Sequence, residues 1–199
     1  MACLNIQHIK LHLSKDNSTN ILGLTETFLS DEIDDKELTI NCFDTERKDR
    51  KHKKGGGILI YISESINYLR RYDLEHDDIE AIWIQINNEY SIPFVLGFIY
   101  RPPQCNNACL KQLNIQLKLQ EAINLEAHFL GDFNIDFSQT DIHGNFTNKT
   151  CQSVVAKRGY KQLTYRQPAQ NGVLTDQLCR AIYCIHLSIM PMQIAITIT

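Results

Sequence analysis

The chain has 199 residues, a formal net charge of −3, 43% hydrophobic residues and 22% charged residues. This length supports one domain with a sizeable core, and the composition is that of a globular rather than a disordered protein. Its 20 basic and 23 acidic residues exclude a simple basic nucleic-acid coat, yet they allow an enzyme that meets phosphate through a metal ion held by carboxylates.

Short apolar runs between polar turns predict strands in the first half of the chain. Ile21–Thr25 is predicted to be a buried strand that ends at Glu26, and Ile58–Ile62 is predicted to be a second strand. Between them lies Thr45–Gly57, a basic segment that ends in three glycines and predicts a loop. We expect the charges of Arg47–Lys54 to form a solvated hairpin loop, with contact to nucleic-acid phosphate as the alternative.

The chain from residue 81 onward adds four predicted strands and two predicted helices. Leucines at near-helical spacing predict an amphipathic helix, and the alternation of AIWIQI predicts a half-buried strand around the core residue Trp83. The predicted strands are Ala81–Ile86, Phe94–Tyr100, Ala127–Leu130 and Gln193–Thr199, and the predicted helices are Cys109–Glu126 and Asn148–Lys157. Because strands outnumber helices and are only partly separated by them, we expect a mixed α+β fold rather than a strict parallel βαβ fold.

The seven cysteines are scattered along the chain and odd in number. This usage indicates reduced thiols in a cytosolic or nuclear protein rather than a disulfide framework. No apolar run reaches the roughly 18 residues that a membrane-spanning helix needs, so no membrane partner is expected.

Polar side chains follow several of the predicted strands directly. Glu26 follows the first, Tyr100 and Arg101 end the strand before two prolines, and Asp132 and Asn134 follow the strand at residues 127–130. Positions two apart in an extended segment point to the same side, so the last two can face one site. Carboxylate and amide oxygens that converge in this way suit a hard cation such as Mg²⁺.

The ordered motifs NI-x-H, LTETFL, RKDR…GGGILIYI, AIWIQI, GFIYRPP and LGDFNID resemble those of the endonuclease/exonuclease/phosphatase superfamily. More narrowly, they resemble the apurinic-type endonuclease domain of non-LTR retrotransposons of the jockey/CR1-like kind. The resemblance covers roughly residues 4–178. It implies a single domain over residues 1–199, eroded after about residue 178. The implied fold is a four-layered α/β sandwich of two β-sheets flanked by helices, as in deoxyribonuclease I.

The resemblance also implies roles for individual residues. Glu26 matches the metal-binding glutamate, and Asn5 matches the asparagine beside that metal. Tyr100 matches the tyrosine that contacts the scissile phosphate, and Arg101 is expected to help bind it. The remaining catalytic positions are Asp132 and Asn134, which position water and phosphate, Asp176, which orients the catalytic histidine, and His186, the nearest match to that histidine.

The implied activity is Mg²⁺-dependent nicking of DNA, with Mn²⁺ as a possible substitute ion. In the family, the nick leaves a 3′-hydroxyl that primes reverse transcription. The expected partner is DNA, the expected state is a monomer, and a functional protein would act in the nucleus.

Two departures from the family pattern stand out. The Ser-Asp-His motif is missing, and its nearest match is Cys184-Ile185-His186, in which Ile185 stands where the aspartate should be. A general acid or base contributes about 10²–10⁴-fold to a rate, so this departure bears directly on activity. In addition, the segment from Asn5 to Glu26 is short by about two helical turns, so we expect most of the first helix to be missing.

Three other readings are left open. The first is a catalytically inactive remnant of the same domain that binds nucleic acid weakly. The second is a phosphoesterase of the same superfamily that acts on a small substrate. The third is a small α+β interaction module whose acids are incidental, although it does not explain the order of the motifs. Glu80, before the strand at residues 81–86, is a possible supporting carboxylate that we do not assign to the site.

Overall fold

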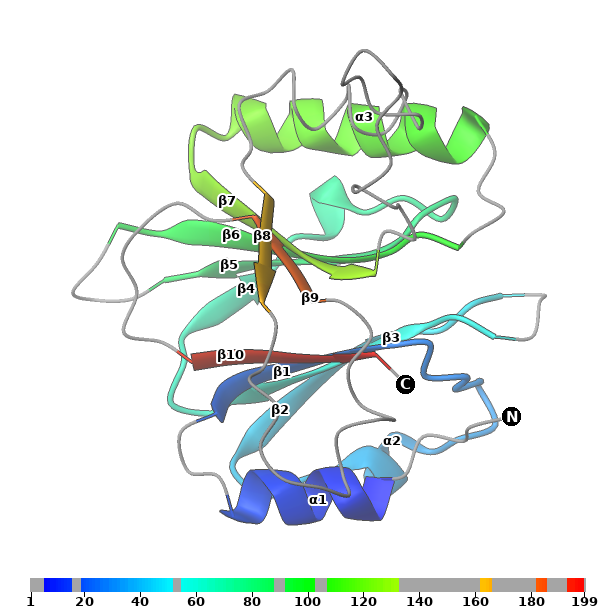
Figure 1. Ribbon diagram of the computed structural model, residues 1–199, viewed down its shortest axis with the longest axis vertical. Helices are drawn as coiled ribbons and strands as arrows, with labels where there is room; N and C mark the ends of the chain where they lie inside the picture. Colours follow the sequence, from blue (N-terminus) through cyan, green and yellow to red (C-terminus); the bar gives the residue numbers. More distant parts are fainter. Residues whose placement is uncertain are drawn as a thin grey trace.

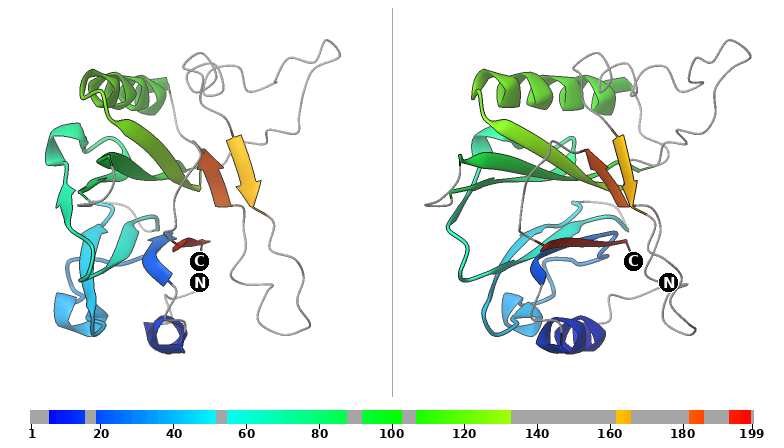
Figure 2. Two further views of the ribbon diagram at one scale, coloured as in Figure 1. Left: turned by 90° about the vertical axis from the view of Figure 1, so that its left-hand side faces the viewer. Right: turned by 60° about the vertical axis from the view of Figure 1, so that its left-hand side comes forward.

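The computed structural model describes residues 6–15, 19–51, 55–87, 92–102, 107–132, 162–165, 182–185 and 193–198. Two four-stranded sheets lie face to face, and helices cover the outer side of each sheet (Figures 1 and 2). The predicted mixed α+β architecture in four layers is therefore confirmed.

The first sheet is built mainly from the N-terminal part of the chain. Its strands, in spatial order, are β10 (Gln193–Ile198), β1 (Thr19–Thr25), β3 (Ile58–Ser63) and β2 (Phe43–Lys48). β1 is parallel to β10 and antiparallel to β3. The prediction of a loop from Thr45 onward is wrong for the first four residues, which belong to β2 and pair with β3. β2 is an edge strand among the described strands, and its polar sequence, FDTERK, suits such a position.

The second sheet has the spatial order β4 (Tyr68–Arg70), β5 (Glu80–Ile86), β6 (Phe94–Tyr100) and β7 (Glu126–Asp132). β5 and β6 are antiparallel, whereas β6 and β7 are parallel. β5 was expected to be half-buried, but Ala81, Ile82, Trp83 and Ile84 are all fully buried. The reason is that this strand has a helix on one face and the other sheet on the other face.

Helices α1 (Ile6–Lys15) and α2 (Asp35–Leu38) lie beside the first sheet, and α3 (Asn107–Ala122) lies beside the second (Figure 1). The expectation that most of the first helix is missing is wrong, because α1 has 10 residues. Its Ile9 and Leu13 are buried against the first sheet. α3 ends earlier than predicted, since Asn124 has a left-handed φ of 58° and turns the chain into β7. None of the described helices is long and apolar enough to cross a membrane.

Three further elements complete the described chain. A 3₁₀ helix, η1 (Tyr72–Leu74), precedes β5, and β8 (Gln162–Tyr165) pairs antiparallel with β9 (Ile182–Ile185). The predicted last strand is confirmed as β10, which ends at Ile198. The predicted helix over residues 148–157 lies outside the described residues.

Three clusters of buried side chains hold the four layers together. One lies between α3 and the second sheet around Trp83, and one lies between α1 and the first sheet around Tyr61. The central cluster joins the two sheets: Ile58, Ile60 and Ile62 of β3 meet Ile82, Ile84 and Ile86 of β5. Alternate side chains of one strand are therefore buried in different clusters, because successive side chains of a β-strand point to opposite faces of the sheet.

Charged side chains also join the two sheets, at the edge formed by β2 and β4. Arg70 of the second sheet donates to Glu46 of the first at 2.7 Å and to Glu75 at 2.8 Å. Lys48 of β2 forms a further ion pair with Glu75 at 3.4 Å. We call these four residues the edge clamp. Their side chains are 10–18% exposed, so solvent screens them much less than an ordinary surface pair.

Candidate active site

Three polar side chains form a row at one end of the second sheet. Glu80 begins β5, Tyr100 ends β6 and Asp132 ends β7, and the strand register makes Tyr100 the direct partner of both acids. Residues paired across strands point to the same face, and Tyr100 belongs to the cluster between the two sheets. The row therefore faces the first sheet.

The first sheet supplies a fourth polar group opposite this row. Glu26 directly follows β1, and its Oε1 accepts a hydrogen bond of 2.5 Å from the hydroxyl of Tyr100. The two residues are 74 positions apart in the sequence. This contact joins the ends of two strands from different sheets, so the site depends on the packing of the whole sandwich.

The surroundings of Tyr100 keep its hydroxyl protonated. Burial raises the pKa of Tyr100, and its hydrogen bond to Glu26 and the negative charges of Glu26 and Asp132 raise it further, while Arg50 acts in the opposite direction. The neutral hydroxyl can therefore donate a hydrogen bond throughout the neutral and mildly alkaline pH range. Both carboxylates are neighbours of Tyr100, Glu26 through its hydrogen bond and Asp132 through the strand register.

The backbone after β1 is strained at two of three consecutive residues. Glu26 has a φ of 57° and Phe28 a φ of 55°, in the left-handed region that bulky side chains rarely adopt. Such outliers cost on the order of 1–3 kcal/mol each, and they cluster at functional sites. The intervening Thr27 is buried, and the N–H of Phe28 donates to the carbonyl of Gly56 at 2.9 Å. The tight turn before β3 thus holds the strained segment in place.

That turn is itself fixed by a charge pair. Arg50 Nε donates to Glu80 Oε1 at 2.6 Å, and Glu80 Oε2 accepts from the N–H of Gly57 at 2.6 Å. The guanidinium carbon of Arg50 lies 5.6 Å from the centre of the Tyr100 ring, within range of a cation–π contact. A side chain at Gly56 would place its Cβ 2.4 Å from Glu80 and 2.5 Å from Arg50. A side chain at this position would therefore require both charged groups to shift.

Four of the eight site residues expected from the sequence are described. Glu26, Tyr100 and Asp132 come together as above. The side chain of Arg101 is buried, with 7% exposure, and its N–H donates to the carbonyl of Asp132 at 2.8 Å. The other four, Asn5, Asn134, Asp176 and His186, lie outside the described residues.

Arg50 and Glu80 are the parts of the site that the sequence did not assign. One signal was available for Glu80: it stands in step with Ile82, Ile84 and Ile86, so it had to share their inward-facing side. Arg50 was expected to be solvated, but it is half-buried against Glu80. Arg47 and Lys48 are likewise half-buried and paired with acids. The described start of the basic segment is therefore a set of internal ion pairs, not a solvated loop.

The described donors suit a hard cation in chemistry but do not form a complete cage. Among the described residues, no group of three or more His, Cys, Asp and Glu side chains is placed to hold a metal ion. Mg²⁺, however, usually takes only one or two carboxylates and completes its shell with water and substrate phosphate. Glu26 and Asp132 fit that requirement.

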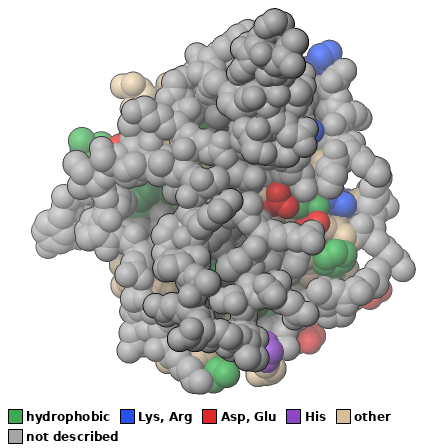
Figure 3. Space-filling view, viewed as in Figure 1, with side chains coloured by type: hydrophobic (Ala, Val, Ile, Leu, Met, Phe, Trp, Pro, Cys, Tyr) green, Lys and Arg blue, Asp and Glu red, His purple; other side chains and the backbone are tan. Residues whose placement is uncertain are grey.

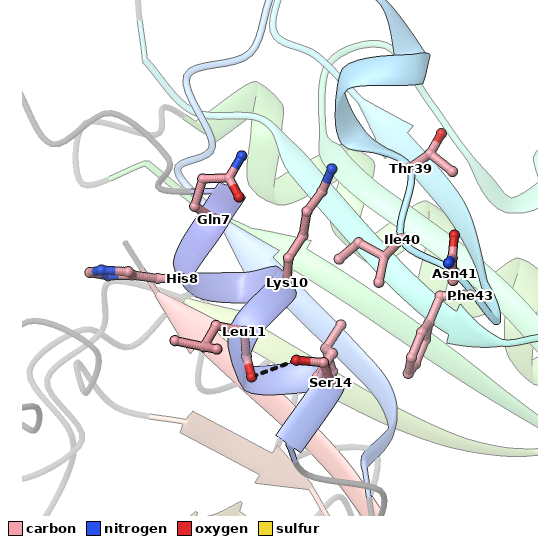
Figure 4. A pocket seen from close by; sticks show the side chains of 10 residues that line it. Gln7, His8, Lys10, Leu11, Ser14, Thr39, Ile40, Asn41 and Phe43 are labelled. Atoms are coloured by element: carbon pink, nitrogen blue, oxygen red, sulfur yellow. Dashed lines mark hydrogen bonds between the residues drawn. The ribbon is translucent and has the colours of Figure 1, made fainter.

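Concave surface also exists away from this site. A hollow of about 650 Å³ lies between α1 and the segment before β2, and Lys10, Leu11, Ile40 and Phe43 are among its lining residues (Figure 4). It lies on the outer side of the first sheet, whereas the polar row belongs to the second sheet and faces the inner side of the first. In the space-filling view, acidic side chains and a basic one instead gather on the right of the molecule (Figure 3).

No protein-family model matches the sequence, and no curated protein matches it. Solved structures do match. The endonuclease domain of TRAS1, a telomere-specific non-LTR retrotransposon, aligns with a TM-score of 0.60 and 12% identity, over 91% of this chain and 78% of that domain. A functionally unknown conserved protein from Enterococcus faecalis V583 aligns with a TM-score of 0.51 and 12% identity, over 79% of this chain and 64% of that protein. The deoxyribonuclease I-like fold implied by the motifs is therefore confirmed.

Proposed function

We propose that this chain is a Mg²⁺-dependent phosphodiester hydrolase that nicks DNA, of the retrotransposon endonuclease type. The observation that carries the proposal is the 2.5 Å hydrogen bond between Tyr100 and Glu26, with Asp132 beside Tyr100 in the strand register. The fold shared with the TRAS1 endonuclease domain and the ordered sequence motifs support the same activity.

Hydrolysis of a phosphodiester requires three things at one place: an activated water, charge to neutralise the phosphate, and stabilisation of the departing oxygen. In this proposal Glu26 and Asp132 hold Mg²⁺, with Mn²⁺ as a possible substitute. When bound, the ion supplies positive charge to the phosphate oxygens. Asp132 accepts a proton from the attacking water, and the protonated Tyr100 orients Glu26.

The remaining roles rest on the family resemblance. Asn5 stands beside the metal, Asn134 binds the phosphate, and Asp176 orients His186. Arg101 helps to bind the phosphate in this scheme, and its burial at the carbonyl of Asp132 suits a part in holding that strand end.

The test is the nicking of supercoiled plasmid DNA in Mg²⁺, with EDTA as the metal-free control. Glu26→Gln and Asp132→Asn are expected to lower the rate by about 10²-fold or more, the usual range for a group that takes part in proton transfer or charge neutralisation. Glu32→Gln is the matched control, because Glu32 is exposed and follows the site segment by only a few residues. It is expected to leave nicking unchanged.

The alternatives predict different results. A remnant that has lost catalysis binds the plasmid weakly and does not nick it at any metal concentration. A phosphoesterase for small substrates hydrolyses bis(p-nitrophenyl) phosphate but leaves the plasmid supercoiled. Nicking that survives both Glu26→Gln and Asp132→Asn would show that the site has been assigned to the wrong residues.

A further inference from the structure

Phe28 is an exposed aromatic side chain two residues after Glu26 of the candidate site. It is 41% exposed, although the preceding residue, Thr27, is only 2% exposed. Single exposed apolar residues are common on protein surfaces, so exposure alone has little meaning. Two further observations make the exposure of Phe28 significant.

The first observation is that Phe28 is held in a conformation that costs free energy. Its φ of 55° lies in the left-handed region, a genuine outlier for a bulky residue. The strain is maintained by the glycine turn, where Gly56 accepts the N–H of Phe28 at 2.9 Å. A Cβ at Gly55 would lie 3.2 Å from Cε1 of Phe28, so the ring packs beside a position that has no side chain.

The second observation is the distance from the reacting groups. Phe28 follows Glu26 by two residues, so their Cα atoms are at most about 7 Å apart. The phosphates of one strand in a duplex are spaced by about 3.4 Å along the helix axis. A base attached one or two nucleotides from a phosphate bound at Glu26 therefore lies within reach of the Phe28 ring.

We propose that Phe28 is a stacking platform for a nucleobase next to the cleaved phosphodiester. This inference rests on the proposed action on a nucleic acid. It adds a contact that depends on a base being present and not on the charge of the phosphate backbone. Every base has an apolar face, so this contact tolerates different sequences. The charge pair Arg50–Glu80 supports the platform indirectly, because it fixes the glycine turn on which Phe28 rests.

Phe28→Trp turns the platform into a reporter. Trp83 is the single tryptophan of the chain and is fully buried, so the added indole supplies the solvent-sensitive fluorescence. A short single-stranded oligonucleotide, titrated in EDTA so that no cleavage occurs, is expected to quench this signal saturably. An abasic strand of the same length and charge is expected to quench it much less. Ile92→Trp is the matched control, because Ile92 is 82% exposed and lies next to the opposite end of β6.

Loss of the ring should weaken binding of the oligonucleotide but not of the abasic strand. A stacked aromatic residue is worth an affinity factor of about 5 to 150 per base, so Phe28→Ala is expected to raise the Kd for the oligonucleotide by at least about fivefold. Phe28→Tyr should restore the affinity. Equal quenching by both strands, or an unchanged Kd in Phe28→Ala, would overturn the proposal.

The two proposals can fail separately. Quenching by the oligonucleotide without any plasmid nicking refutes the hydrolase and leaves the stacking platform standing. Nicking that depends on Glu26, together with no base-dependent quenching, refutes the platform alone. Far-UV circular dichroism and urea unfolding of each variant identify a substitution that has simply unfolded the protein.

Discussion

Gly56→Ala tests whether the Arg50–Glu80 pair fixes the turn beside the site. Gly56 has a φ of 76°, where an alanine costs about 1–2 kcal/mol. The new Cβ would also lie 2.4 Å from Glu80 Oε2 and 2.5 Å from Arg50 Nε, so both side-chain ends must shift, and we expect their hydrogen bond to be lost. A hydrogen bond between charged groups contributes about 1.5–3 kcal/mol, and these side chains are only 19% and 14% exposed. The free energy of unfolding should therefore fall by about 2.5–5 kcal/mol.

Gly55→Ala is the control that separates the two contributions. Gly55 has a similar φ of 87°, but its added Cβ meets only the ring of Phe28 at 3.2 Å, and that exposed ring can move. Gly55→Ala should therefore cost about 1–2 kcal/mol. Urea unfolding followed by the fluorescence of the buried Trp83 measures both values. Equal losses in the two variants would refute the idea that Gly56 makes room for the charge pair.

Three further predictions concern the core, the site and the edge clamp. Burial raises the pKa of Tyr61 from 10.0 to about 12, so the unfolded chain loses this proton first and the free energy of unfolding falls between those pH values. Between pH 9 and pH 11 this group should lower the free energy of unfolding of the parent protein by about 1.4 kcal/mol, measured by urea unfolding. Tyr61→Phe should not show this part of the decrease. Tyr100→Phe removes a hydrogen bond to a carboxylate and should lower the kcat of nicking by about tenfold or more, with a pH–rate profile measured alongside; an unchanged kcat would remove Tyr100 from the site. Arg70→Met removes two ion pairs of the edge clamp, so that Glu75 keeps only Lys48 and Glu46 keeps only its hydrogen bond from Tyr68, and it should lower the free energy of unfolding by about 1.5–3 kcal/mol. Arg71→Met, whose ion-pair partner is 60% exposed, should lower it by no more than about 1 kcal/mol. Similar losses in the two variants would show that the edge clamp contributes no more than an ordinary surface pair.

The local sequence pattern predicted the central strands well, because buried strands contain runs of consecutive apolar residues. Phe94–Tyr100 forms β6 with the bounds predicted, since an apolar run stopped by prolines leaves little choice. The polar edge strand β2 was missed over Thr45–Lys48, because its stability comes from pairing with β3 rather than from its own side chains. The length of the first helix was also underestimated. The expectation came from the short segment between Asn5 and Glu26, but a short segment can still contain a helix, and α1 has 10 residues.

The site was predictable only where a motif named its members. Glu26 and Tyr100 are 74 residues apart, and their expected proximity came from the family resemblance rather than from any local signal. Arg50 and Glu80 are 30 residues apart, and no periodicity links a basic loop to the first residue of a strand. Such long-range pairs form because the sheets bring distant segments to one edge, and the local pattern of residues in one sequence does not show which segments meet.

Because Glu26 approaches from one sheet and Tyr100 from the other, the side chains between the sheets set the gap that these two must bridge. Stacked sheets stand about 10 Å apart, and the isoleucines of β3 and β5 fill that space. Shortening one of them, for example by Ile84→Val, would let the sheets settle closer together without touching a reacting group. The central core thus acts as a spacer between Glu26 and Tyr100, and replacements there are expected to change the distance between these two side chains while every polar residue at the strand ends stays the same.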